Sequence, residues 1–369
     1  MKIAIVAGEA SGDLHAAEVV AELKKLDPKL ETFGIGGDLL QREGMRVLHH
    51  AREMGIVGLF YVLRHIGMFR RIFREYVEAL AKERPDAVLL VDYPGFNLRV
   101  AKKCKEMGLR VIYYISPQVW AWRKGRVKHI ARYVDEMLVI FPFEEDFYRE
   151  HDVKVTYVGH PLIDEMRVPS GSRRPVDDRL KPVLTLALLP GSRRSEIHAL
   201  LPPMLDAVAQ LKNIDAFIIQ APTISSKELF DIMQRSGTIV RLVPHDRGES
   251  LAAADVAISS SGTATLECAI AGTPVVVVYR LSPANYWLAK RVVTLPHFSL
   301  INIVAGKKVV PELLQHDVNG ERIARAIREM TAPVEYERIK RELAAVKEKL
   351  GAPGASRRAA EVIMKAAQA

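Results

Sequence analysis

The stretch VLTLALLPGSRRSEI, residues 183–197, decides the fold. Its first seven residues are almost wholly apolar, and Pro190 and Gly191 follow them directly. Such a run, bounded by turn residues, predicts a buried strand, and the polar residues after the turn begin a helical pattern. A buried strand that turns at once into a helix is the repeating unit of a doubly wound parallel sheet, so we expect an α/β fold.

The same alternation recurs on both sides of this stretch. Helical patterns such as 15–26 and 68–82 separate further apolar runs, which therefore form parallel strands. The predicted strands are 2–8, 32–37, 86–93, 110–117, 136–142 and 155–161 in the first half, and 183–190, 216–221, 238–244, 256–261 and 274–280 in the second.

Residues 166–182, MRVPSGSRRPVDDRLKP, separate the two series of strands. This segment has three prolines, many charges and no apolar period, which is typical of an exposed connection between domains. We therefore expect two Rossmann-like domains, 1–168 and 169–344. We expect the strand-free helical tail, about 345–369, to pack back on the first domain or on a partner subunit.

Size and composition agree with two globular domains. A chain of 369 residues exceeds one ordinary core, and 49% hydrophobic with 26% charged residues is globular usage. Cys104 and Cys268 are the only cysteines, which excludes a disulfide framework, and the first residues form a strand pattern rather than a signal peptide. No apolar run reaches the roughly 18 residues of a membrane span. We expect a cytoplasmic protein whose membrane contact is peripheral.

The charge distribution favours an anionic partner. The net charge is +9, and residues 99–132 hold ten Lys or Arg against the single acid Glu106. A nucleic acid, an anionic lipid surface and a phosphorylated substrate each fit such a charge. The basic run lacks the interleaved aromatics of an RNA-binding motif and an evident helix-turn-helix, so we expect no nucleic-acid partner.

Two turns of the second domain suit a nucleotide diphosphate. Residues 190–196, PGSRRSE, and residues 259–267, SSSGTATLE, each follow a strand and begin a helix. Helix N-termini offer N–H groups and a positive dipole end to phosphate. In the ordinary alternative, Ser or Thr caps each helix and the charged residues face solvent. Two such turns in one domain favour the nucleotide site, although the chain has neither a GxxxxGK[ST] loop nor a GxGxxG sequence.

The first domain contains a candidate base. Asp92 ends an apolar strand, within DYPGFN 92–97, where partial desolvation would raise the pKa of its carboxyl. An Asx turn before Pro94 is the alternative. Residues 7–13, AGEASGD, end the first strand with two carboxylates and a serine, which suits acceptor recognition. The candidate catalytic residues are therefore Asp92, Glu9 and Ser11.

Two further segments carry aromatic and basic side chains. SPQVWAWR, 116–123, ends another strand; Trp120 and Trp122 are core residues by default and acceptor-site residues as the alternative. The helix 64–74 combines four arginines with an apolar face, as an interfacial helix or an ordinary surface helix does. Its candidates for acceptor or membrane contact are Phe69, Arg70, Arg71 and Phe73. We expect no metal site, because HExxH, clustered cysteines and Asp-x-Asp are all missing.

These motifs, in this order, resemble the lipid-A-disaccharide synthase family. The resemblance covers about residues 3 to 315 and implies a GT-B fold, in which two Rossmann-like domains face each other across the active site. It is carried by AGEASGD 7–13, DYPGFN 92–97, SPQVWAW 116–122, LPGSR 189–193 and SGTATLEC 261–268, with YR 279–280, WLAKR 287–291 and LINIVAG 300–306 also fitting.

The resemblance implies an inverting glycosyltransferase without a cofactor. Such an enzyme transfers 2,3-diacylglucosamine from its UDP conjugate to 2,3-diacylglucosamine 1-phosphate, which forms a β-1,6-linked disaccharide and releases UDP. The acceptor would bind the first domain and the UDP-sugar the second. The enzyme would work on the anionic inner face of the inner membrane, and the family's dimers, which exchange C-terminal segments, imply a homodimer as one assembly.

The same resemblance assigns roles to the candidate residues. Asp92 would take the proton of the acceptor's 6-hydroxyl, Arg193 and the 261–265 turn would stabilise the departing diphosphate, and Glu267 would hold the ribose. Arg194 follows Arg193, so which arginine contacts phosphate stays open. The expected donor-site residues are Gly191, Ser192, Arg193, Ser261, Gly262, Thr263, Ala264, Thr265, Glu267, Arg280 and Asn302. The alternative is another UDP-sugar enzyme of this fold, either an epimerase or a peptidoglycan-precursor N-acetylglucosaminyltransferase.

Overall fold

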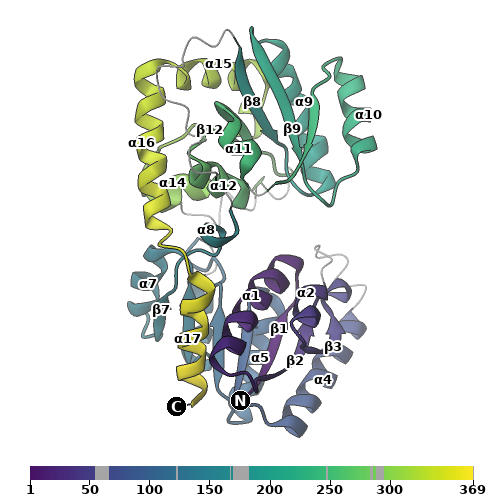
Figure 1. The fold of residues 1–369 in the computed structure, drawn as a ribbon, viewed down its shortest axis with the longest axis vertical. Coiled ribbons are helices and arrows are strands. Elements are labelled where there is room, and N and C mark those ends of the chain that lie inside the picture. Colours follow the sequence, from purple (N-terminus) through teal and green to yellow (C-terminus); the bar gives the residue numbers. More distant parts are fainter. Residues whose placement is uncertain are drawn as a thin grey trace. The chain divides into compact units, whose positions relative to one another are not determined.

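The computed structural model describes residues 1–54, 66–121, 124–166, 168, 183–246, 248–282, 286–287 and 295–368. The chain divides into two compact units, unit 1 (Met1–Pro161 with Leu350–Ala369) and unit 2 (Leu162–Lys349). Each unit contains one parallel sheet, which confirms the expected α/β fold (Figure 1).

Unit 1 is built on a seven-stranded sheet in the order β3-β2-β1-β4-β5-β6-β7, with every pair parallel. The central strands β1 and β4 are buried almost throughout, as strands with helices on both faces are. The strands are β1 (Lys2–Ala7), β2 (Glu31–Gly36), β3 (Arg46–His50), β4 (Ala87–Val91), β5 (Val111–Tyr114), β6 (Glu136–Val139) and β7 (Val155–Tyr157). The helices are α1 (Ala10–Leu26), α2 (Asp38–Arg42), η1 (Ala51–Glu53), α4 (Ile66–Glu83), α5 (Pro94–Glu106), η2 (Lys124–Arg126), α6 (Val127–Tyr133), α7 (Pro142–Arg149) and α17 (Ala355–Gln368).

Unit 2 repeats this plan with a six-stranded parallel sheet in the order β10-β9-β8-β11-β12-β13. The strands are β8 (Leu184–Leu189), β9 (Ile214–Gln220), β10 (Arg241–Pro244), β11 (Val256–Ser260), β12 (Val275–Tyr279) and β13 (Glu312–Leu314). The helices are α8 (Leu162–Glu165), α9 (Arg194–Ala209), α10 (Ser226–Ser236), α11 (Glu249–Ala253), α12 (Thr263–Ala271), α14 (Leu300–Ala305), η4 (Gln315–Asp317), α15 (Gly320–Met330) and α16 (Pro333–Lys349).

The last helix, α17, packs on α1 of the same chain (Figure 1). Its buried face consists mainly of small residues, Ala355, Ala359 and Ala360 among them, so the two helices approach closely. The Ser356 hydroxyl donates to Glu18 of α1 at 3.2 Å. The C-terminal segment is therefore part of unit 1 in this chain.

Two strands of the structure, β3 and β13, were not expected. Both lie at a sheet edge, and their residues are mostly half-buried rather than buried. An edge strand needs no continuous apolar run, so RVLHH and ELL carry no strong strand signal. Among the residues described, no helix has both the length and the apolar character that crossing a bilayer requires.

Candidate active site

Each sheet reverses its strand order at one point, and four of the five turns selected from the sequence lie there, while the turn 116–123 follows β5. In unit 1 the reversal falls between β1 and β4, and in unit 2 between β8 and β11. Ligands of such sheets bind beyond the carboxyl ends of the strands at this point, because the two loops diverge to opposite faces. The turns after β1 and β4 contain Glu9 and Asp92, and those after β8 and β11 contain Arg193 and Gly262.

Asp92 occupies a strained backbone turn. Asp92 and Tyr93 have φ of 45° and 48°, a left-handed conformation that non-glycine residues rarely adopt. The Asp92 carbonyl accepts from the Asn97 side chain at 2.7 Å and from the Tyr113 hydroxyl at 2.6 Å. Its N–H donates to the Tyr114 carbonyl at 3.0 Å. These bonds hold the turn in place, so the carboxylate extends from a fixed backbone position.

The surroundings of Asp92 favour the protonated carboxyl. Burial, and then the negative charge of Glu9, raise the pKa of Asp92 to about 6, against a hydrogen bond from the Tyr93 backbone and the charge of His15. A carboxylate with this pKa is mostly ionised at neutral pH and still accepts a proton readily. Both properties suit a general base.

The turn after β1 packs directly against this strained turn. A Cβ on Gly8 would lie 2.6 Å from the Tyr93 ring, so only glycine fits there. The Tyr93 hydroxyl donates to the Met54 carbonyl at 3.0 Å, and burial followed by the charge of Glu9 raises the Tyr93 pKa. The structure thus brings Glu9 close to both Asp92 and Tyr93.

The start of α1 contains both accessible and buried polar residues. Ser11 is exposed and Glu9 is half-buried, whereas Asp13 is buried. The Asp13 carboxylate accepts from the N–H groups of Gly37 at 2.6 Å and Leu39 at 3.0 Å. Asp13 therefore stabilises the turn between β2 and α2, and Glu9 and Ser11 are the polar side chains of this turn that a ligand can reach.

Trp120, in the turn after β5, is a buried residue of unit 1 and is 7% exposed. Its indole N–H donates to Glu144 at 3.0 Å, and its ring meets the Phe143 ring edge-on at 4.9 Å between centroids. Sequence reasoning did not select Glu144, a buried acid in the first turn of α7. Trp122 lies outside the described residues.

The apolar face of α4 packs on the core of unit 1. Phe69 and Phe73 are half-buried against the core, and Phe73 meets Phe96 of α5 edge-on at 5.9 Å. Arg70 and Arg71 are exposed. The helix therefore presents arginines to solvent and most of its aromatic surface to its own unit.

In the turn after β8, backbone N–H groups already face a carboxylate. Glu196 accepts from the N–H groups of Ser192 at 3.2 Å and Arg193 at 3.4 Å, and it pairs with the Arg193 guanidinium at 2.9 Å. Gly191 has φ of 117°, and a Cβ there would lie 2.4 Å from Glu196. Arg194 pairs instead with Glu228 of α10 at 3.3 Å. The turn is therefore shaped for an anion, and Arg193 faces it.

The turn after β11 leaves the start of α12 without a side-chain cap. Gly262 is the N-cap residue, and no acid lies in the first turn. The Ser261 and Thr265 hydroxyls donate to backbone carbonyls at 3.0 and 2.8 Å, while Thr263 is exposed and Ala264 half-buried. The N–H groups at this helix start suit an anion better than those of α9, because its first turn has no acid, whereas Glu196 accepts from the N–H groups before α9.

Glu267, one turn into α12, has a partner that the sequence did not suggest. His245, directly after β10, lies 3.2 Å from the Glu267 carboxylate. The Glu267 side chain is only 13% exposed. The imidazole contact therefore helps to orient the Glu267 carboxylate, which lies near the end of β10.

Arg280 and Asn302 bind backbone inside unit 2. The Arg280 guanidinium donates to the carbonyls of Gln315 and Val318, and to that of Ala199 at 3.1 Å. Pro203 of α9 has no N–H for the Ala199 carbonyl, so Arg280 replaces the missing donor. The Asn302 amide is fully buried and bonds the backbone of Val309 and Val310. Both side chains hold the fold, and we leave them out of the proposed donor site.

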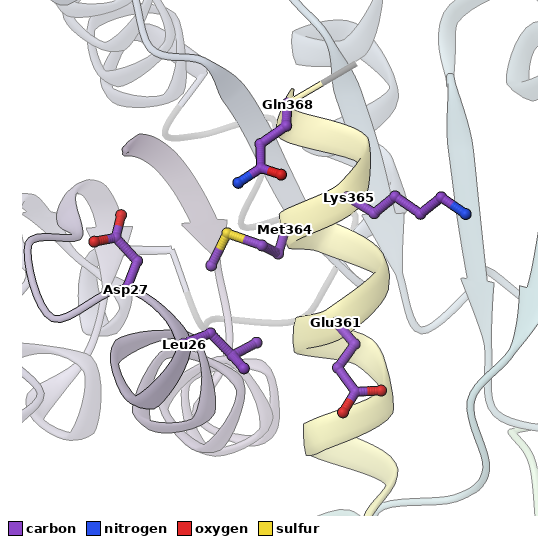
Figure 2. Close-up of a pocket in the computed structure, with 6 residues that line it drawn as sticks. All are labelled: Leu26, Asp27, Glu361, Met364, Lys365 and Gln368. Atoms are coloured by element: carbon purple, nitrogen blue, oxygen red, sulfur yellow. The ribbon is translucent and has the colours of Figure 1, made fainter.

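A pocket of about 510 Å³ lies elsewhere in unit 1, between the end of α1 and α17 (Figure 2). Figure 2 shows Met364 reaching toward Leu26, with charged residues around them. Because the pocket adjoins the last residue of α1, it lies at the opposite end of that helix from Glu9. It is not part of the candidate site.

Comparison with known proteins agrees with this architecture. Residues 3–366 match the family described as lipid-A-disaccharide synthetase. The lipid-A-disaccharide synthase of Myxococcus xanthus is 44% identical over 98% of this chain and 97% of its own. Among solved structures, the UDP-GlcNAc 2-epimerase of Neisseria meningitidis bound to UDP-GlcNAc has a TM-score of 0.64 at 14% identity, covering 99% of this chain and 100% of its own. MurG of Acinetobacter baumannii has a TM-score of 0.62 at 12% identity and covers 99% of each chain.

The structural neighbours support a GT-B fold, and the match to the family extends from the first strand into α17. The chain therefore belongs to the lipid-A-disaccharide synthetase family and is a glycosyltransferase.

Proposed function

We propose that this glycosyltransferase joins two 2,3-diacylglucosamine units. It takes one unit from its UDP conjugate, transfers it to the 6-hydroxyl of 2,3-diacylglucosamine 1-phosphate, and releases UDP. The family match over residues 3–366 carries this proposal. The fold shared with an epimerase bound to UDP-GlcNAc supports a UDP-sugar as the donor.

Asp92 is the proposed base, supported by the geometry and charge of its turn. Its carboxylate takes the proton of the acceptor's 6-hydroxyl while that oxygen attacks the anomeric carbon of the donor. The bond from that carbon to the UDP diphosphate breaks in the same step, so the anomeric centre inverts. A pKa of about 6 lets Asp92 accept this proton at neutral pH.

Unit 2 stabilises the departing UDP in this proposal. The diphosphate meets the uncapped start of α12, from Ser261 to Thr265, and the guanidinium of Arg193. It also competes with Glu196 for the N–H groups of Ser192 and Arg193. Glu267, held by His245, accepts from the ribose hydroxyls.

We also propose that unit 1 binds an anionic membrane surface at the inner face of the inner membrane through exposed cations. Arg70 and Arg71 of α4 and lysines of α5 such as Lys102 and Lys103 face solvent and attract anionic lipid. Phe69 and Phe73 contribute little, because they pack on the core. In a flotation assay at low salt, the protein should float with anionic vesicles. It should stay at the bottom of the gradient with neutral vesicles.

The reaction is tested with the purified protein, the UDP-diacylglucosamine donor and the 1-phosphate acceptor, in EDTA and without added metal. UDP and disaccharide should appear in equal amounts, and neither should appear when the acceptor is left out. Conversion of the donor to an epimer without acceptor would indicate the epimerase alternative. Absence of disaccharide with both substrates present would exclude the proposed reaction.

A further inference from the structure

Glu144 is a buried acid whose carboxylate accepts hydrogen bonds from the segments that follow β5 and β6. Its side chain is on α7, and the residue is 1% exposed. One carboxylate oxygen accepts from the Ser116 hydroxyl at 2.5 Å and from the Trp120 indole at 3.0 Å. The other accepts from the N–H groups of Ile140 at 3.3 Å and Phe141 at 3.1 Å. Glu144 therefore joins the turn after β5 to the turn after β6.

The turn after β5 is strained where Glu144 holds it. Ile115 has φ of 62°, a left-handed conformation that is especially unfavourable for a β-branched residue. Ser116 follows immediately, and its hydroxyl donates to Glu144. Strained residues of this kind persist only where the surrounding contacts hold them, and they cluster at functional sites.

The carboxyl end of β5 also bonds the backbone of Asp92. β5 pairs with β4, and the Asp92 N–H donates to the Tyr114 carbonyl one residue before Ile115. Tyr113 donates its hydroxyl to the Asp92 carbonyl at 2.6 Å. The segment 113–120 thus contacts the proposed base through Tyr113 and Tyr114, and Glu144 through Ser116 and Trp120.

A purely structural role explains these contacts less well. Burial raises the pKa of Glu144 to about 7 in spite of its four hydrogen bonds, so the ionised side chain is expensive to bury. The unit contains a second buried acid for comparison, Glu136, which is 2% exposed and bonds Thr156 and Lys154. Glu136 begins β6 and lies at the amino ends of the strands, away from Asp92.

We propose that Glu144 is a positioning residue that fixes the Ser116–Ala121 turn next to Asp92, so that this turn and the base form one rigid surface for the acceptor. This inference rests on the proposed function, since it takes the acceptor to bind unit 1. The residue acts through the turn and does not itself meet the substrate.

The experiment compares Glu144→Gln with Glu136→Gln as a matched control for loss of a buried carboxylate. We expect Glu144→Gln to lower kcat/KM for the acceptor about tenfold or more, because a displaced turn misaligns the acceptor, with UDP affinity unchanged within about twofold. Glu136→Gln should reduce the urea midpoint and leave kcat/KM within about twofold of the wild type. Ser116→Ala and Trp120→Phe each remove one donor and should lower kcat/KM by a smaller factor, about two- to fivefold.

An unchanged kcat/KM in Glu144→Gln, or an equal loss in Glu136→Gln at matched folded fraction, would overturn the proposal. Ser116→Ala and Trp120→Phe decide the question if Glu144→Gln does not fold, because both keep the carboxylate. Trp120 fluorescence, measured after Trp122→Phe and Trp287→Phe, separates this inference from the proposed function. Glu144→Gln should make Trp120 more accessible to acrylamide even if the wild-type protein forms no disaccharide, and equal quenching would contradict the positioning role.

Discussion

The two units have the same sheet topology and opposite chemistry at the point where strand order reverses. In unit 1, a strained turn places Asp92 near Glu9, and burial with this negative charge favours a bound proton. In unit 2, glycine turns and helix starts present N–H groups, with Arg193 beside them. The topology determines where a ligand binds, and the residues of the turns determine whether that place takes up a proton or an anion.

The way each turn is stabilised also differs. In unit 1, side chains such as Asn97 and Tyr113 donate to the Asp92 carbonyl and hold an unfavourable backbone. In unit 2, Glu196 neutralises the N–H groups of one helix start, and the start of α12 has no side-chain cap. The first turn is therefore held in place by neutral donors, whereas the N–H groups of the second already bind a carboxylate, which the proposed diphosphate would have to replace.

Asp92→Asn is the strongest test of this contrast. If unit 1 supplies the base, the variant should lose about 10²- to 10⁴-fold in kcat, because an amide cannot take the proton. UDP affinity, measured by calorimetry, should stay within about twofold, because the proposed nucleotide site is in unit 2. Asparagine tolerates the left-handed φ of 45°, so the backbone turn should persist.

Asp86→Asn is the matched control. Asp86 lies at the other end of β4, where its carboxylate accepts from the Lys2 N–H at 2.7 Å. This variant should keep wild-type kcat. A full kcat in Asp92→Asn, or an equal loss in both variants, would remove Asp92 as the base.

Arg193→Ala against Arg194→Ala tests the anion site and answers which arginine contacts phosphate. Arg193 pairs with Glu196 at the turn, whereas Arg194 pairs with Glu228 of α10. We expect Arg193→Ala to weaken UDP binding about tenfold, the loss of one charge-assisted hydrogen bond, and Arg194→Ala to weaken it less than about twofold. Isothermal titration with UDP measures both. The reverse ranking would show that the 190–196 turn rearranges to present Arg194.

The pH dependence of kcat/KM tests whether Asp92 acts as the base in unit 1. Because the base must be ionised, the rate should rise with pH and level off above about 6, the pKa of Asp92. One pH unit below this value the rate should be about tenfold lower than the plateau. Glu9→Gln removes a charge that raises this pKa, so its profile should shift to lower pH. An unshifted profile would mean that Glu9 does not act on the base.

Local patterns in the sequence predicted both sheets and all four turns at the reversal points. Apolar runs that end in Gly, Pro or polar residues report a buried strand and its turn without reference to the rest of the chain. The edge strands β3 and β13 were missed because their half-buried residues carry no such run.

The sequence did not predict which side chains pair when they are far apart in the chain. Glu144 bonds Ser116, which is 28 residues away, and His245 bonds Glu267, which is 22 residues away. Only the folded sheet brings these strand ends together. Arg280 and Asn302 show the reverse case, since the family resemblance implied that they line the donor site, and in the structure their side chains bond backbone groups of unit 2.

The last test measures stability, and it distinguishes a carboxylate that serves the reaction from one that stabilises the fold. Asp92 has a pKa raised from 3.8 to about 6 in the folded protein, so the folded state binds its proton more tightly than the unfolded state does. Stability therefore falls as pH rises through this window, and the full cost is present above about 6. Asp92→Asn removes that cost and should stabilise the protein by about 2 kcal/mol at pH 7.5, since one pKa unit corresponds to about 1.4 kcal/mol and solvent reaches part of the side chain.

Urea unfolding at pH 7.5 and pH 4 measures this gain. At pH 4 the folded Asp92 is protonated and the unfolded one nearly half so, so most of the advantage of the variant should disappear there. Asp86→Asn should give no gain in stability, because it replaces a carboxylate that accepts a hydrogen bond from the Lys2 N–H. If the variant loses turnover and its gain in stability grows between about pH 4 and pH 6, the Asp92 carboxylate destabilises the fold and serves the reaction. An Asp92→Asn protein less stable than the wild type at pH 7.5 would instead assign the carboxylate to the turn itself.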